Sequence, residues 1–222
     1  MKGCDIMKRK IDFKDIATAN RLIKLSCELF RIRIPEIYYI YNRKNDFRLM
    51  DENLQTISYD FRSIGFRIDE IEFDPKNYGI YINIDILKER LMGYVVILRK
   101  IRTLYQLSQI QKQRKSQRIL EDEELIQAWK FAYQYRKKEY VSESPIEMDC
   151  NAYTYLIMNY IFDVDVSFKP RDEKVYQQHQ ERLKKSYSYS RVLELAKKYQ
   201  IQVEIARLFD LEDFQKEFSK KK

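Results

Sequence analysis

The sequence predicts a mostly helical α+β fold with a small antiparallel sheet near the N-terminus, and three observations support this prediction. Short β-rich runs lie before residue 85. All four glycines fall at or before Gly93, and the rest of the chain is rich in Leu, Ile, Lys, Gln, Glu and Arg, which favours helices. The length of 222 residues suits one sizeable domain with a small appendage.

The N-terminal part begins with a helix and continues with strands. Apolar residues recur at helical spacing over 13–32, which predicts an amphipathic helix. Its apolar face consists of Ile16, Ala19, Ile23, Cys27 and Phe30. The runs "EIYYIY", "SIGFRIDEIEF" and "IYINI" are rich in β-branched and aromatic residues, so we expect them to form strands of one antiparallel sheet.

The second half of the chain predicts a series of helices. Asp85 is a candidate N-cap for a long helix over 86–117, whose middle is apolar enough to be buried on most sides. A helix at about 122–138 begins in the acidic "EDEE" run, which suits a positive helix N-terminus, and another begins at "SPIEMDCNAY". Further helices are expected at 172–185, 188–199 and 209–220.

The composition excludes several classes of protein. Four glycines cannot build a glycine-rich phosphate loop, and three cysteines without a C-x-x-C pair favour neither a disulfide framework nor a cysteine zinc site. No apolar run approaches the roughly 20 residues that a bilayer-spanning helix needs. We therefore expect a cytoplasmic protein without membrane association, and the sequence leaves its oligomeric state open.

Basic residues outnumber acidic residues by 42 to 34, which gives a net charge of +8. From Arg90 to Leu120 the chain has eight basic residues and no acidic one. This stretch is either a solvated helix end, compensated by "EDEE", or a surface that contacts phosphate or acidic groups. Positions 114 and 118 share one helical face if the long helix continues past residue 111. The candidate partner-binding residues are Lys112, Arg114, Lys115 and Arg118.

Two segments carry a resemblance to a known family, "RKIRTLYQ" at 99–106 and "PIEMDCNAY" at 145–153. Over roughly residues 15–162 the chain resembles small gluzincin-like metallopeptidase-like proteins of low-GC bacteria, phages and mobile elements. The pattern of that family is H-E-x-R-H-x-x-Q on one helix and E-x-D-A-N-A-F on a later one. Two histidines at i and i+4 and a later glutamate bind zinc in gluzincins. The resemblance therefore implies a zincin-like two-helix core.

The resemblance also implies that the metal-binding helix has lost its chemical groups. Arg99 and Thr103 stand at the two histidine places, and Lys100 stands at the place of the catalytic glutamate. Arg102 and Gln106 keep the residues of the family. Because arginine and lysine are poor zinc ligands near neutral pH, we expect neither zinc nor any other cofactor.

Glu147 matches the third zinc ligand of the family, and Asn151, four residues later, matches a position beside the ligands. We expect a cation from Arg99 or Lys100 to pair with Glu147 and to fill the place of the metal. Two alternatives involve no site. Glu147 also fits a capping box that begins at Ser144, and the basic residues of 99–102 also fit a solvated helix flank.

The leading functional hypothesis is a pseudoenzyme, with residues 1–170 as a degenerate metallopeptidase-like domain and 171–222 as a helical extension packed on it. Such a protein, encoded by a phage or mobile element, would bind or inhibit an acidic host protein or a ribonucleoprotein. The alternative is a basic DNA- or RNA-binding protein. The only histidine, His179, is expected at the surface, and Cys150 is expected in the core.

Overall fold

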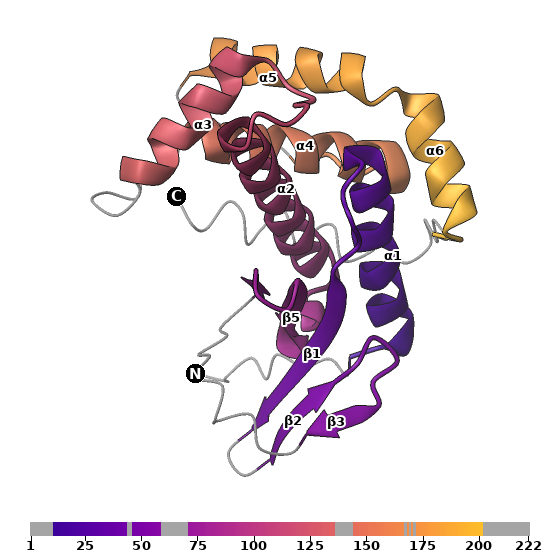
Figure 1. Ribbon diagram of the computed structural model, residues 1–222. Helices are drawn as coiled ribbons and strands as arrows, with labels where there is room; N and C mark the ends of the chain where they lie inside the picture. Colours follow the sequence, from indigo (N-terminus) through magenta and orange to yellow (C-terminus); the bar gives the residue numbers. More distant parts are fainter. Residues whose placement is uncertain are drawn as a thin grey trace, which may run out of the picture.

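The computed structural model describes residues 11–43, 46–58, 71–135, 144–166, 168, 170 and 172–201. Its helices are α1 (Phe13–Phe30), η2 (Ile84–Lys88, a 3-10 helix), α2 (Arg90–Arg114), α3 (Glu123–Tyr135), α4 (Pro145–Phe162), α5 (Glu173–Ser186) and α6 (Tyr189–Lys198). Its strands are β1 (Glu36–Arg43), β2 (Asp46–Met50), β3 (Thr56–Ser58), β4 (Ile71–Asp74) and β5 (Gly79–Asn83). The sheet lies at one end of the molecule and α3, α4 and α5 lie at the other, with α2 running between them (Figure 1).

The five strands form one sheet in the order β3-β2-β1-β5-β4. Strand β1 runs parallel to β5, with Glu36 opposite Gly79, whereas the other neighbouring strands are antiparallel. The prediction of a mostly helical α+β fold is confirmed, but the prediction of a purely antiparallel sheet is wrong. The physical reason is which strand of the β4–β5 hairpin pairs with β1. Strands β4 and β5 form a hairpin, and this hairpin joins the sheet through β5, so that the second strand of the hairpin lies beside β1.

The long helix begins later than the sequence suggested. Asp85 lies inside η2, and the residue that caps η2 is Asn83, whose side chain accepts a hydrogen bond from the backbone N–H of Asp85. The expected cap at Asp85 is therefore wrong, and α2 starts at Arg90 without a side-chain cap. Gly93 allows η2 to pack closely against α2, because a Cβ at this position would lie 2.8 Å from the carbonyl oxygen of Ile86.

The core lies between the helices and the sheet. The whole predicted face of α1 is buried, from Ile16 to Phe30. Helix α2 packs against both α1 and α4, so its apolar middle is enclosed on most sides, as predicted. At the start of α4, Ser144 Oγ accepts a hydrogen bond from the backbone N–H of Glu147 at 3.3 Å, and Pro145 occupies the first turn. The predicted N-cap of α4 is confirmed.

The C-terminal helices lie against the rest of the molecule. Helices α5 and α6 both contact α4, and α6 also contacts α1. The helix expected at 209–220 and the first part of the "SIGFRIDEIEF" run fall outside the described residues. Among the helices that the structure describes, none combines the length and the apolar character needed to cross a bilayer.

Candidate functional site

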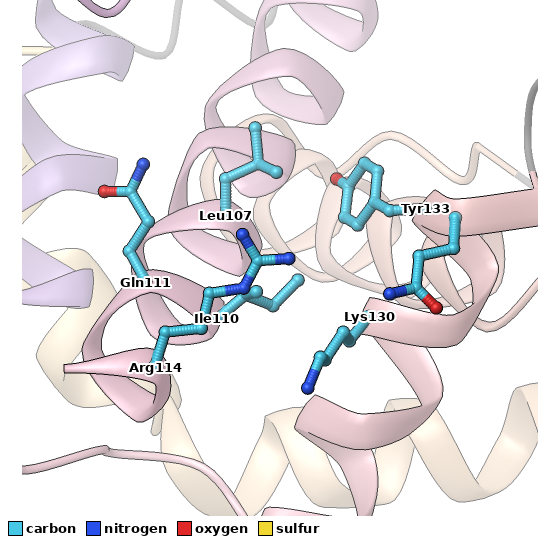
Figure 2. A pocket seen from close by; sticks show the side chains of 7 residues that line it. Leu107, Ile110, Gln111, Arg114, Lys130 and Tyr133 are labelled. Atoms are coloured by element: carbon cyan, nitrogen blue, oxygen red, sulfur yellow. The ribbon is translucent and has the colours of Figure 1, made fainter. Parts of the chain in front are cut away.

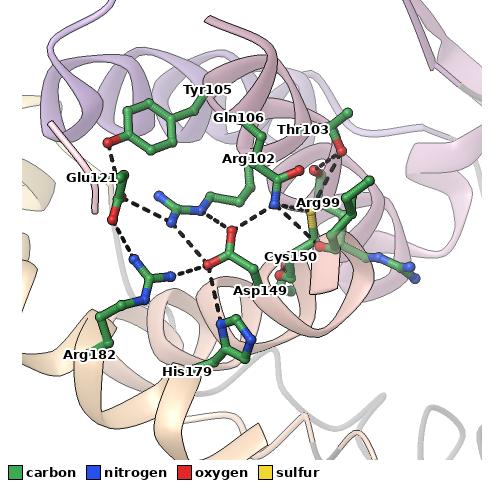
Figure 3. A network of polar contacts seen from close by, with 12 residues as sticks. Arg99, Arg102, Thr103, Tyr105, Gln106, Glu121, Asp149, Cys150, His179 and Arg182 are labelled. Carbon is green, nitrogen blue, oxygen red and sulfur yellow. Dashed lines mark hydrogen bonds and ion pairs between the residues drawn. The ribbon is translucent and has the colours of Figure 1, made fainter. Parts of the chain in front are cut away.

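A buried cluster of charged residues joins α2 to α4, and its centre is Arg102 (Figure 3). The side chain of Arg102 is fully buried. Its Nε and Nη2 atoms donate hydrogen bonds to the two carboxylate oxygens of Asp149 at 2.8 and 3.0 Å. This two-bond geometry is the strongest form of an arginine–carboxylate pair. The pair therefore fixes the position of α4 on α2.

A second carboxylate and a second cation complete the cluster. Glu121, in the connection between α2 and α3, accepts a hydrogen bond from Arg102 Nη2 at 3.3 Å. Arg182 of α5 donates to Glu121 at 2.5 Å and also donates to Asp149. Two cations thus face two carboxylates. Because a charge is stable in a protein interior only when it is paired and hydrogen-bonded, this balance accounts for the complete burial of Arg102.

Aromatic rings surround the guanidinium group of Arg102. Five ring centroids lie between 4.6 and 5.9 Å from its Cζ atom, within the range of about 6 Å at which a cation is attracted to a ring face. The rings belong to Phe30, Tyr105, Trp129, Tyr153 and Tyr187. The Tyr187 hydroxyl also accepts a hydrogen bond from Arg102 Nη1 at 3.1 Å. One buried cation therefore contacts rings from α1, α2, α3, α4 and the residue that follows α5.

The electrostatics keep the pair of Arg102 and Asp149 ionised. Burial alone would lower the pKa of Arg102, but the attraction and hydrogen bonding of Asp149, together with the attraction of Tyr187 and Glu121, outweigh it and hold the pKa above the ordinary value. Burial likewise opposes ionisation of Asp149, but the attraction of Arg102 and Arg182 is stronger, so the pKa of this carboxyl lies below the ordinary value. The two side chains therefore act as a fixed ion pair.

His179 lies beside this cluster, so the prediction of a surface histidine is wrong. Its Nδ1 is 3.8 Å from Asp149 Oδ1, and only a tenth of its side chain is exposed. Burial lowers the pKa of His179 more than the negative charge of Asp149 raises it. The signal in the sequence was the helical spacing of His179 with Tyr176 and Leu183, which are both buried on α5.

Arg99 and Thr103, which the resemblance would place at two ligand histidines, both face the start of α4. Arg99 Nη2 donates to Glu147 Oε2 at 2.5 Å. One turn later, Thr103 Oγ1 lies 3.5 Å from the sulfur of Cys150. The predicted contact between Glu147 and a basic side chain of 99–102 is confirmed, and Arg99 makes it. Cys150 is buried as expected, and burial raises the pKa of its thiol to about 12.

The remaining residues of the predicted site have different surroundings. Gln106 is buried, and its Nε2 donates to Asp149 at 2.7 Å and to the carbonyl oxygen of Ile146 at 3.2 Å. Lys100 is half-buried. Asn151 is also half-buried, and its Oδ1 has no hydrogen-bond partner among the described residues. The structure therefore brings Arg102 and Gln106 into the charged cluster through their hydrogen bonds to Asp149.

The basic residues after position 111 lie at the surface, but not on one helix. Helix α2 ends at Arg114, and Ser116 has a positive φ of 51°, which turns the chain away from the helix axis. Lys112 is half-buried, and Arg114, Lys115 and Arg118 are exposed. The expectation that residues 114 and 118 share one helical face is therefore wrong. Lys112 and Arg114 instead lie in the last turn of α2, and Lys115 and Arg118 follow its C-terminal end.

The sequence analysis did not identify three members of the charged cluster, which are Asp149, Glu121 and Arg182. Asp149 stands at the aspartate of the E-x-D pattern, so the motif contained a signal for it. Glu121 belongs to the acidic run before α3, where it fits a stabilising role at a helix N-terminus. Arg182 is one of several basic residues on α5, and nothing in its neighbours distinguishes it. Their convergence depends on tertiary packing.

The residues at the position where the resemblance would place a metal do not fit a zinc ion. A zinc site needs three or four neutral or anionic ligand atoms, whereas the guanidinium of Arg99 already occupies Glu147. Within the part of the chain that the structure describes, no three His, Cys, Asp or Glu side chains are grouped closely enough to hold a metal ion. Comparison of the chain with protein-family models, with curated proteins and with solved structures gives no match.

Proposed function

We propose that this chain is a non-catalytic binding protein built on a metallopeptidase-like scaffold, in which an internal ion pair takes the place of the metal. The ion pair between Arg99 and Glu147 carries this proposal. Under this proposal Arg99 stands at the position of a ligand histidine and Glu147 at the position of the third ligand. The guanidinium group of Arg99 would then take the place of the divalent cation that the family binds. Thr103, at the second histidine position, lies one turn away against the same part of α4.

The partner that we propose is an acidic host protein or a ribonucleoprotein of the cytoplasm, and a phage or mobile element is the proposed origin of the gene. Support comes from the net charge of +8 and from the exposed cations Arg114, Lys115 and Arg118 at the end of α2. Complementary charge accelerates association and excludes partners of like charge. The same exposed cations favour direct binding of DNA or RNA as the second candidate function.

Restoration of the ligands tests the scaffold. In the variant Arg99→His/Thr103→His, two imidazoles at i and i+4 would face Glu147, and we expect about one zinc ion per chain after dialysis, against none for the wild type. The matched control is Leu107→His/Gln111→His, which has the same spacing on another part of α2. If the first variant binds no more zinc than the control, positions 99, 103 and 147 do not form a metal geometry and the proposed relationship is wrong.

Capture of partners from host extract, with and without nuclease, separates the two candidate functions. A protein partner is expected to remain bound after nuclease treatment and to tolerate moderate salt. Binding through phosphates would instead weaken steeply as the salt concentration rises. Loss of all captured protein after nuclease treatment would favour the nucleic-acid function.

A further inference from the structure

A surface pocket of about 250 Å³ opens between α2 and α3 (Figure 2). Leu107, Ile110 and Tyr133 form its apolar walls, and Arg114 and Lys130 also line it. An engineered protein cavity of about 150 Å³ is already large enough to bind benzene. The space between α2 and α3 is therefore sufficient for one large apolar side chain, although it is small for a cofactor.

The apolar walls come from both helices. Ile110 is almost fully buried at 5% exposed, whereas Leu107 remains 37% exposed, more than most apolar residues of α2. The ring of Tyr133 faces them from α3 (Figure 2). Insertion of an apolar group between these side chains would remove their exposed surface from water, which is favourable by the hydrophobic effect.

Positive charge lines the same pocket. No carboxylate is among the residues that line it, and neither Arg114 nor Lys130 forms an ion pair with any residue that the structure describes. An apolar space beside two cations that pair with no described carboxylate is complementary to an apolar group that has carboxylates next to it.

The buried charged cluster holds one wall of the pocket in place. The Tyr133 hydroxyl donates to Gln106 Oε1 at 3.1 Å, and Gln106 Nε2 in turn donates to Asp149. The position of the Tyr133 ring is therefore fixed before any ligand arrives. A pocket that is already formed costs less conformational entropy on binding.

We propose that this pocket binds an acidic segment of a partner protein. One large apolar side chain of the segment enters between Leu107 and Tyr133, and carboxylates beside it pair with Arg114 and Lys130. This inference rests on the proposed binding function and adds a location and a chemistry to it. A protein segment fits better than a nucleic acid, because the walls at Leu107 and Ile110 are aliphatic and offer no polar partner to the edge of a base.

Titration of the full chain with short blocked peptides, followed by NMR, tests the proposal. The probe is the acetylated and amidated peptide DELFED, and the controls are the neutral NQLFQN and the acidic DESSED. We expect DELFED to shift the resonances of Leu107 and Tyr133, and we expect each control peptide to bind about tenfold more weakly. The variant Arg114→Gln/Lys130→Gln should weaken DELFED about tenfold. The matched variant Lys174→Gln/Lys184→Gln removes two exposed charges from α5 and should leave binding unchanged.

Several results would overturn the proposal. Equal binding of DELFED and NQLFQN would remove the role of charge, and absence of any shift at Leu107 and Tyr133 would remove the pocket as a site. A single-stranded oligonucleotide that shifts the same resonances, with steep salt dependence, would assign the surface to phosphate.

The failure of this inference is distinguishable from failure of the proposed function. If DELFED does not bind, and if Arg114→Gln/Lys130→Gln captures the same host protein as the wild type, the inference is wrong and the proposed function stands. Zinc-dependent peptide hydrolysis by the wild type would instead contradict the proposed function itself.

Discussion

The substitution Asp149→Asn is expected to lower the free energy of unfolding by about 3–5 kcal/mol, because it leaves a buried cation without its main partner. Each oxygen of the Asp149 carboxylate accepts two hydrogen bonds. Oδ2 accepts from Arg102 and Gln106, and Oδ1 accepts from Arg102 and Arg182. An asparagine must place its NH₂ group against one of these pairs of donors, whichever way the amide is turned. The loss therefore includes a hydrogen-bond conflict as well as the loss of a charge.

Urea unfolding, followed by far-UV circular dichroism, measures this effect. With a slope of about 3 kcal/mol per molar urea, the expected loss lowers the midpoint by more than about 1 M. The exposed carboxylate of Glu194 pairs with Arg191, and Glu194→Gln should leave the midpoint nearly unchanged. The double variant Arg102→Met/Asp149→Leu removes both charges and should be less damaging than Asp149→Asn alone. If Asp149→Asn unfolds within about 0.3 M urea of the wild type, the buried pair does not stabilise the fold in the way we describe.

Three further predictions concern the surroundings of this cluster. Glu147→Gln should lower the free energy of unfolding by only about 1–2 kcal/mol in the same urea assay, because the side chain of Arg99 is one-third exposed and can turn to water. A loss as large as that of Asp149→Asn would contradict this prediction. Burial lowers the folded-state pKa of His179 below its ordinary value of 6.5, so the neutral form contributes stability that is present above pH 6.5 and is lost as the pH falls through the folded pKa. The wild type should therefore lose stability below about pH 6.5 in the urea assay, relative to His179→Gln. Greater stability of the wild type at the lower pH would mean that the pKa is raised instead. Charge reversal at the four basic residues around the end of α2 should leave the thermal midpoint almost unchanged and should sharply reduce capture of the host partner, and unchanged capture would place the interface elsewhere. These residues are Lys112, Arg114, Lys115 and Arg118.

The sequence predicted elements well where their signals are local. The buried face of α1 follows from apolar spacing within one segment, and the start of α4 follows from Ser144 and Pro145. The pairing of β1 with β5 has no local signal, because it joins segments about forty residues apart, with Glu36 opposite Gly79. Its parallel direction depends on where the β4–β5 hairpin docks, which neither strand encodes by itself.

The same limit applies to the candidate site. The contact of Arg99 with Glu147 was predictable because two short motifs placed both residues. The burial of Arg102 was not, because its hydrogen-bond partners come from three separate parts of the chain, with Asp149 on α4, Glu121 before α3 and Tyr187 after α5. A basic residue on a helix resembles a solvated residue until the elements that surround it are assembled.

The proposed relationship separates the motif residues into two groups with different burial. Arg102, Gln106 and Asp149 match the pattern of the family, and all three are completely buried in one hydrogen-bonded network. The substituted residues include Arg99, which is one-third exposed, and Thr103, which is half-buried. Substitution of Arg102, Gln106 or Asp149 would break the contact between α2 and α4. Under the proposed relationship, substitution at positions 99 and 103 removes only the ability to bind a metal. A scaffold selected for binding and no longer for catalysis is therefore expected to retain the first group and to lose the second.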